Sequence, residues 1–168
     1  MRKKKFDIDG LIVEKSKHGL GIFAMRSFAA GEDCFEVIGR LVTDRQMARL
    51  SQTDRNNTFR YNKDLYLSPK GELGDFLNHS CRPNCHVEKR KNRLFVVATR
   101  PIRPREELVM DYSTIIGNDD VWIMACGCQN TNCRGIIGQF KDLPETVKAR
   151  YRRLNAVPIY IERKTSKM

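Results

Sequence analysis

The sequence predicts one mainly β domain with short helices. The chain has 168 residues, a length that suits a single domain. Short apolar or alternating runs recur along it, set apart by glycines and prolines, and these are typical of small strands joined by tight turns. The runs are irregularly spaced, which disfavours both a regular sandwich and a series of β-α-β units.

Strand-like runs dominate the first two thirds of the chain. The pattern predicts strands at residues 11–15, 21–24, 34–38 and 65–67. Between them, residues 43–51 are predicted to form a short helix, because Thr43 is a suitable N-cap and an apolar face follows it.

A hairpin and one longer helix are predicted in the second half. Apolar residues on either side of the charged stretch 88–93 predict two strands joined by a turn. Residues 107–112 are expected to be the buried end of a further strand. A proline and an acidic residue near the start of residues 142–154, with arginines toward the end, predict a helix there.

Composition excludes several classes of protein. The hydrophobic share of 40% is too high for a wholly disordered chain, and the longest apolar run, residues 94–98, is far shorter than the roughly 20 residues of a membrane-spanning helix. Acidic and polar residues follow the basic N-terminus where a signal peptide would be apolar, so we expect an intracellular protein. The net charge of +11 favours acidic partners such as nucleic acid, although a basic domain that is merely soluble is an equally good interpretation.

Three of the six cysteines lie close together. Cys126, Cys128 and Cys133 form a cluster that suits a structural zinc ion better than separate disulfides, and it indicates a reducing compartment. Zinc normally takes four ligands, and the residues alone leave the fourth open. The candidates fall in one short stretch: His79, Cys81, Cys85 and His86. Free or buried cysteines are the alternative, and for Cys34, in an apolar run, a core position is the better interpretation.

Two further motifs are candidate binding sites. Gly19-Leu20-Gly21 would let a ligand approach the backbone, or would form a tight turn. It lacks the third glycine of a dinucleotide-binding motif and the Lys-Ser/Thr of a phosphate-binding loop, which excludes both. Residues 78–85 are polar and follow an apolar pair, so if buried they need partners or a ligand; a capped turn is the alternative.

Taken in order, five strings resemble the SET-domain protein-lysine methyltransferases, over about residues 10–140. They are Gly19-Leu20-Gly21-Ile22-Phe23-Ala24, Gly31-Glu32, Phe76-Leu77-Asn78-His79-Ser80-Cys81-Arg82-Pro83-Asn84, Glu107-Leu108-Val109-Met110-Asp111-Tyr112 and Cys126-Gly127-Cys128-x4-Cys133-Arg134-Gly135. The resemblance implies a β-clip-like fold of several small twisted sheets with a knot-like active site. It divides the chain into a basic tail (1–9), a SET domain (10–117), a zinc-binding post-SET segment (118–140), and a C-terminal helix with a basic tail (141–168).

The same resemblance implies the site residues. S-adenosylmethionine would be bound by Lys17, His18, Gly19, Leu20, Gly21, Asn78, His79, Tyr112 and Trp122. Zinc would be held by Cys81, Cys126, Cys128 and Cys133, which selects Cys81 as the fourth ligand. Phe59, Tyr61 and Met110 would line the substrate channel, with Tyr66 a further candidate for a second active-site tyrosine. For Trp122 a core or hinge position is the alternative.

The chemistry accounts for these residue types. A lysine amine must lose its proton before it attacks a methyl group, and a nearby sulfonium and an apolar channel both lower its pKa. Tyr112 is therefore expected to be the catalytic residue by orienting the reactants, because an ordinary tyrosine pKa near 10 disfavours a phenolate base. The resemblance places Met110 at a position where a Phe or Tyr commonly influences the number of methyl groups added. Because a methionine cannot donate the hydrogen bond that a tyrosine would, di- or trimethylation is favoured.

No reader module or pre-SET cysteine array precedes the domain, so the resemblance implies a stand-alone enzyme that finds its protein substrate with its own surface. Basic residues near both ends could steer it to nucleic-acid-associated proteins of chromatin or a nucleoid, or could be solvated and silent. They are Arg2 to Lys5, Arg150 to Arg153, Arg163, Lys164 and Lys167. Two alternatives are a zinc-containing basic module that binds nucleic acid or protein without turnover, and a SET protein that has lost activity.

Overall fold

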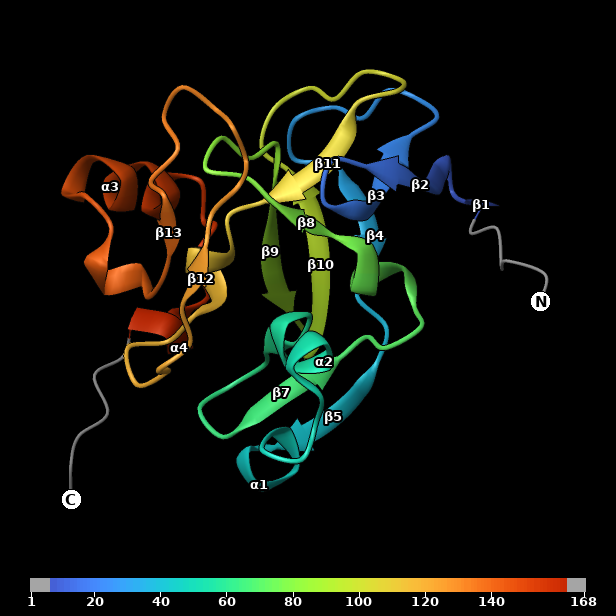
Figure 1. Cartoon of the computed structure of the whole chain (residues 1–168). Helices are drawn as coiled ribbons and strands as arrows, with labels where there is room; N and C mark the ends of the chain where they lie inside the picture. Colours follow the sequence, from blue (N-terminus) through green and yellow to red (C-terminus); the bar gives the residue numbers. More distant parts are fainter. Residues whose placement is uncertain (1–6, 163–168) are drawn as a thin grey trace.

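The computed structural model describes residues 7–162, and most of their regular structure is strand (Figure 1). The strands form four small sheets, which confirms the predicted mainly β class. In order across each sheet they are β1 (Asp7–Ile8), β2 (Leu11–Ser16), β3 (Gly19–Ala24), β11 (Glu107–Met110) and β8 (Asn78–His79); β4 (Asp33–Glu36), β10 (Arg93–Ala98) and β9 (Cys85–Arg90); β5 (Arg40–Thr43), β7 (Leu65–Ser68) and β6 (Phe59–Arg60); and β12 (Met124–Ala125) with β13 (Ile136–Ile137).

The helices are short. They are α1 (Asp44–Met47), α2 (Gln52–Asn56), α3 (Glu145–Arg153), α4 (Ile159–Glu162) and the 3-10 helices η1 (Leu73–Phe76), η2 (Tyr112–Ile115) and η3 (Phe140–Asp142). Thr43 caps α1 as predicted. The predicted helix over 43–51 is nevertheless too long, because the side chain of Ser51 accepts a hydrogen bond from the Asp54 amide and so starts α2, which the sequence pattern did not indicate.

The predicted hairpin is formed by β9 and β10. Its turn is Lys91-Asn92, and both residues have positive φ, the conformation that matches the twist of paired strands. The two strands lie in the middle sheet (Figure 1), whose inward side chains join the main hydrophobic core. Cys34 is buried in that core, as predicted.

The strand β11 brings two distant parts of the sequence together. It pairs antiparallel with β3 on one side and parallel with β8 on the other. Beyond β8, the Ser80 amide donates to the Met110 carbonyl and the Asn84 amide to the Val109 carbonyl, at 2.8 and 3.1 Å. Residues 78–84 therefore lie beside the strand that leads to Tyr112.

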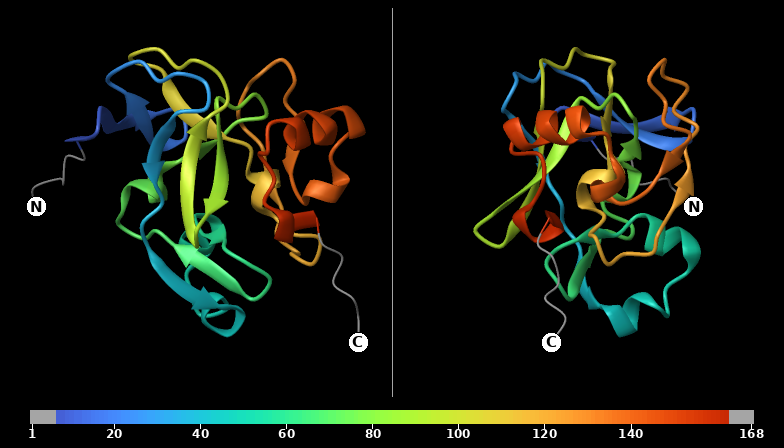
Figure 2. Two further views of the ribbon diagram at one scale, coloured as in Figure 1. Left: turned by 180° about the vertical axis from the view of Figure 1, so that it is seen from behind. Right: turned by 90° about the vertical axis from the view of Figure 1, so that its left-hand side faces the viewer.

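The C-terminal part packs beside the sheets around a second, smaller core (Figure 2). Tyr151 of α3 and Ile161 of α4 are buried there against Phe140. The helix predicted over 142–154 is α3, preceded by Pro144. The terminal basic residues at 2–5 and 163–167 lie outside the described part of the chain. Within residues 7–162, no helix is long and apolar enough to cross a membrane.

Candidate active site

Two cavities meet at Tyr112. This residue lies two positions after the end of β11, next to Asp111. One, of about 320 Å³, is lined by His18, Asn78 and His79 together with Gly127 and Cys128. The other, of about 420 Å³, has mostly apolar walls that include Phe59, Leu77, Ile115 and Trp122. Tyr112 lines both. The site thus has one polar and one apolar chamber that share a tyrosine.

Two hydrogen bonds fix Tyr112. Its hydroxyl donates to the Leu77 carbonyl at 2.6 Å, and its amide donates to Nδ1 of His79 at 3.1 Å. Burial raises the pKa of the hydroxyl above its usual range. The side chain is therefore a neutral, oriented phenol, which suits a positioning group and not a phenolate base.

His79 is buried and neutral. Burial lowers its pKa to about 4, more than the nearby Asp111 carboxylate offsets. Since Nδ1 accepts the Tyr112 amide proton, the ring proton sits on Nε2, which lies 3.5 Å from Sγ of Cys81. The ring therefore links the tyrosine backbone to the cysteine cluster.

Asp111 is a buried anchor that the sequence analysis assigned no role. Its side chain accepts hydrogen bonds from Arg134 and from the Tyr151 hydroxyl, both at 2.7 Å, and from the Ser113 amide at 3.1 Å. Arg134 belongs to the cysteine-bearing segment and Tyr151 to α3. One carboxylate thus ties both of these parts to the end of β11.

Asn78 is held on the other side of the polar chamber by Glu107. Its side-chain amide donates to the Glu107 carboxylate at 2.8 Å and to the Leu20 carbonyl at 3.0 Å, while Ser16 also donates to Glu107. A Cβ at Gly21 would lie 2.2 Å from that carboxylate. The absence of a side chain at Gly21 therefore leaves room for the Glu107 carboxylate. That Gly21 also contacts a cofactor stays a prediction.

The four cysteines named by the resemblance converge. The Sγ atoms of Cys81, Cys126, Cys128 and Cys133 all lie within 4.8 Å of one another. Those of Cys81 and Cys126 are 3.7 Å apart, close to the ~3.8 Å edge of a tetrahedron with zinc–sulfur bonds of about 2.3 Å. Cys85 lies instead in the main core, as Cys34 does. The donor set and spacing fit a tetrahedral zinc ion.

The other predicted site residues are spread more widely. Trp122 lines the apolar chamber and not the polar one; its indole donates to Asn56 at 2.7 Å. Phe59 and Tyr66 line the same chamber, whereas Tyr61 and the fully buried Met110 line neither. The Tyr61 hydroxyl donates to the Asn92 carbonyl at the β9–β10 turn. Lys17, Gly19, Leu20 and Gly21 also line neither chamber, although His18 beside them does.

Comparison with known proteins agrees with this geometry. The family described as "SET domain" matches residues 19–113, from β3 through β11 to η2. The chain belongs to the SET-domain family. This family membership confirms the resemblance found in the sequence, and the fold of the solved relative below confirms the predicted architecture.

Three proteins with a similar sequence or fold illustrate this membership. A histone-lysine N-methyltransferase, H3 lysine-36 specific, from Chaetomium globosum is 32% identical over 146 residues, 76% of this chain and 15% of the relative. Histone-lysine N-methyltransferase Set2 of Drosophila melanogaster is 30% identical over 80% of this chain and 6% of its own length. The methyltransferase domain of human histone-lysine N-methyltransferase SETMAR has a TM-score of 0.62 and 25% identity, covering 76% of this chain and 57% of that chain. The chain thus spans less than a fifth of the length of the Chaetomium globosum and Drosophila melanogaster proteins.

Proposed function

We propose that this chain transfers a methyl group from S-adenosylmethionine to the side-chain amine of a lysine in a protein substrate. The observation that carries the proposal is the position of Tyr112 between a polar and an apolar chamber. A methyl transferase needs donor and acceptor to approach from opposite sides of one point, and two chambers that share a tyrosine supply that arrangement.

The polar chamber is the proposed S-adenosylmethionine site. Its lining offers an imidazole at His18, the Asn78 amide group and the neutral ring of His79, which suit a zwitterionic amino-acid group and an adenine. When bound, S-adenosylmethionine supplies an electrophilic methyl carbon on a positively charged sulfur. The protein's part is to hold Asn78 in place through Glu107 and His79 through Tyr112.

The apolar chamber is the proposed lysine channel. Phe59, Leu77 and Ile115 give it an apolar wall, and Asp120, which also lines it, is paired with Arg60 at 2.9 Å. Partial removal from water along this wall lowers a lysine pKa because the charged form loses hydration. The amine can therefore lose its proton to solvent without a dedicated base. The Tyr112 hydroxyl donates its hydrogen bond to the Leu77 carbonyl, so its oxygen lone pairs remain available to orient the amine.

Zinc is the proposed partner of the cysteine cluster. Cys81 lies two residues after the end of β8, while the other three cysteines come from the loop whose Gly127 and Cys128 line the polar chamber. A tetrahedral ion at these sulfurs would hold that loop against the chamber. We further propose, from the names of the curated relatives, that the substrate is a histone tail, which places the activity at chromatin.

The test compares two tyrosines that make similar hydrogen bonds. Tyr112→Phe removes a hydroxyl that donates to the Leu77 backbone carbonyl. Tyr160→Phe removes a hydroxyl that donates to the Arg60 backbone carbonyl, and Tyr160, unlike Tyr112, lines neither chamber. Methyl incorporation from radiolabelled S-adenosylmethionine into histone H3 and nucleosomes gives the rate, and calorimetry with S-adenosylhomocysteine gives the affinity.

We expect Tyr112→Phe to lower the rate by roughly 100-fold, in the range found for one oriented catalytic group, with little change in affinity. Tyr160→Phe should keep both close to wild type, and Asn78→Ala should abolish cofactor binding. Full activity of Tyr112→Phe would contradict the proposal. No cofactor binding at about 1 mM, equivalent to roughly −4 kcal/mol, would favour the zinc-containing binding module instead.

A further inference from the structure

Four arginines from three segments line a third cavity, of about 360 Å³, that shares no lining residue with the two chambers at Tyr112. Arg82 comes from the loop after β8, Arg100 from the loop after β10, and Arg150 and Arg153 from α3. Pro83, Thr99 and Leu154 complete the lining. Two of the segments are joined by a backbone hydrogen bond, because the Thr99 amide donates to the Asn84 carbonyl at 2.8 Å.

The positive charge of this cavity is poorly neutralised. None of its lining residues is acidic, and of the four arginines only Arg100 has a carboxylate partner, Glu106, among the described residues. Arg150 instead faces the Tyr151 ring at 5.6 Å. By contrast, the neighbouring Arg152 is paired with Glu145 and Glu162 and does not line the cavity. All four cavity arginines are exposed, so an anion can reach them from solvent.

The spacing suits phosphate groups. Arg150 and Arg153 stand one turn apart on the same face of α3, and each guanidinium offers a planar pair of N–H donors that matches two phosphate oxygens. The loop that follows Arg100 carries Arg103 and Arg105, both exposed, so the charge extends past the cavity. A row of this kind fits a repeating polyanion better than a single phosphate.

We propose that this arginine cavity binds the phosphate backbone of a nucleic-acid duplex without reading its sequence. No aromatic residue lines it, so the stacking that holds single-stranded bases is missing, and the net charge of +11 adds long-range attraction. The inference does not depend on the proposed methyl transfer, because it concerns a different cavity and is tested by binding alone. For an enzyme of chromatin, it would hold the substrate's DNA while the tail enters the apolar chamber.

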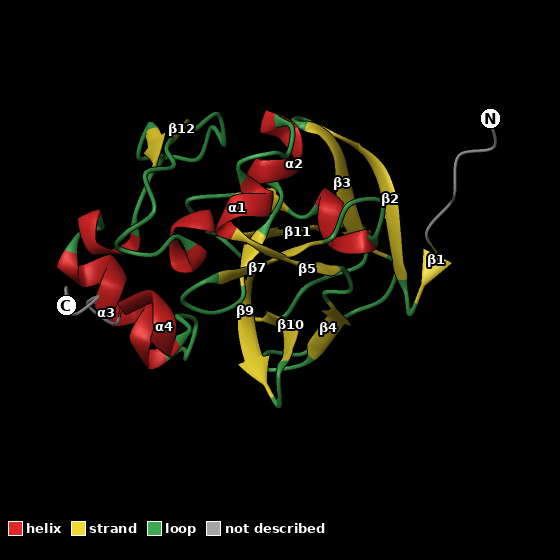
Figure 3. Cartoon of the chain, turned by 90° about the horizontal axis from the view of Figure 1, so that it is seen from below, coloured by secondary structure: helices red, strands yellow, loops and turns green. Residues whose placement is uncertain are grey.

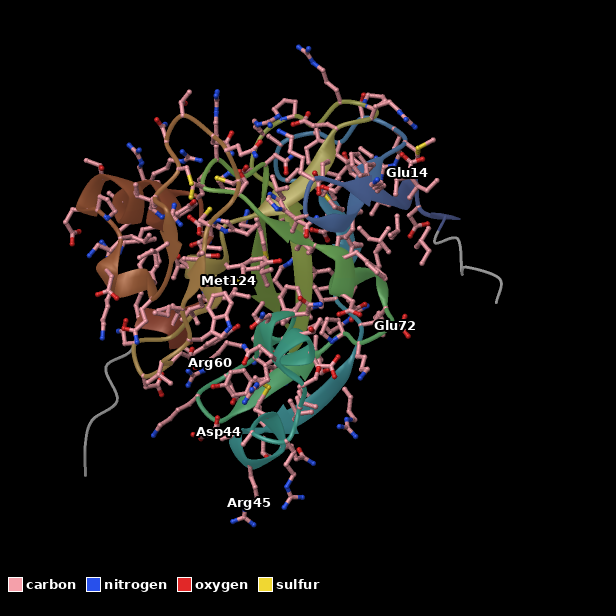
Figure 4. All side chains as sticks on the ribbon, in the orientation of Figure 1. Glu14, Asp44, Arg45, Arg60, Glu72 and Met124 are labelled. Carbon is pink, nitrogen blue, oxygen red and sulfur yellow. The ribbon has the colours of Figure 1, made fainter. Side chains whose placement is uncertain are left out.

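The test measures binding of a fluorescent 24-base-pair DNA duplex by anisotropy over a series of salt concentrations. The variant Arg150→Gln/Arg153→Gln removes two cavity charges. Its matched control, Arg45→Gln/Arg49→Gln, also removes two exposed arginines, one in α1 and one two residues after it. These lie at the far end of the molecule, where Figure 4 shows Arg45 pointing into solvent. Thermal unfolding checks that both variants fold, and Arg82→Gln tests the cavity from a segment outside α3.

We expect the cavity variant to bind at least tenfold more weakly near 0.1 M salt, and its log–log salt slope to fall by about 1.8, because each phosphate contact on duplex DNA contributes roughly 0.9. Arg82→Gln should lower the slope by about half as much. The control pair should change the affinity less than threefold. Equal losses in the two pairs would mean diffuse attraction and would overturn the proposal. The proposal would also be overturned if a single-stranded oligonucleotide or a phosphoserine peptide bound as tightly as the duplex and lost as much affinity in the cavity variant.

Discussion

The body built around β11 and the cysteine-bearing segment at residues 121–137 differ in how they hold their shape. In the body, Leu108 and Met110 are fully buried and Asp111 is 1% exposed. In the segment, Val121 is 96%, Ile123 71% and Ile136 62% exposed. Figure 3 shows β12 standing apart from the strands of the body, although both of its residues, Met124 and Ala125, line the polar chamber.

The difference shows which region can fold on apolar burial alone. β12 and β13 have two residues each, and a two-stranded hairpin of this size is not stable in water by itself. The segment is held to the body by the cysteine cluster and by the Arg134–Asp111 ion pair. The body contains a continuous core from several sheets. We infer that a metal ion stabilises the segment, and that the body folds without it.

Metal removal should separate the two regions with the largest effect. A chelator, or Cys128→Ser, should abolish hydrogen-exchange protection in residues 121–137 and lower methyl transfer by more than about 100-fold, since structural zinc contributes folding free energy directly. Peptides over residues 105–112 should keep their protection. Exchange mass spectrometry on both regions in one sample gives the comparison. Simultaneous loss of protection in both regions would mean that the body also depends on the metal.

Asp111 joins the two regions, so its replacement should weaken both. Asp111→Ala leaves the largely buried Arg134 guanidinium without its carboxylate, which should lower the free energy of unfolding by about 3 to 5 kcal/mol. Tyr151→Phe removes one hydrogen bond to the same carboxylate and should lower it by about 1 to 2 kcal/mol. Urea unfolding measures both. Equal, small effects would show that the carboxylate is not an anchor.

Local patterns in the sequence predicted the elements whose signals are local. The β9–β10 hairpin, α3 and the Thr43 cap were all expected, because alternation, a proline at a helix start and a capping threonine act within a few residues. The strands β12 and β13 and the helix α2 were not, since these short elements depend on cysteines, a restart at Ser51 and contacts far away in sequence.

The site was predictable where a string of residues is specific. The Asn78–Asn84, Glu107–Tyr112 and Cys126–Cys133 strings led to Asn78, His79, Tyr112 and the four cysteines. The structure places Asn78, His79 and Tyr112 around one cavity and brings the four cysteine sulfurs together. Asp111 and Glu107 were missed as site residues, because their partners Tyr151 and Asn78 lie 40 and 29 residues away. A charged residue inside the apolar run 107–112 was the one available signal.

The smallest effect concerns His86, on β9 in the body. Neither of its ring nitrogens has a hydrogen-bond partner in the described structure, and burial lowers its pKa from 6.5 to about 4, with a smaller effect from Arg90. Below pH 6.5 His86 is protonated in the unfolded chain but stays neutral in the folded chain. Acid should therefore lower the free energy of unfolding by up to about 3 kcal/mol between pH 6.5 and 4.

His86→Leu should remove this contribution and raise stability at pH 7 slightly, because no unpaired polar group is left buried. His86→Gln should also remove the pH dependence while keeping a polar group at the position. The measurement is the difference in unfolding free energy between each variant and wild type from pH 7 to 4.5, because pH effects that are common to all three proteins cancel in this difference. A difference that stays constant with pH would show that His86 takes up its proton as readily in the folded body as in the unfolded chain, and so contributes nothing to the acid sensitivity of the molecule.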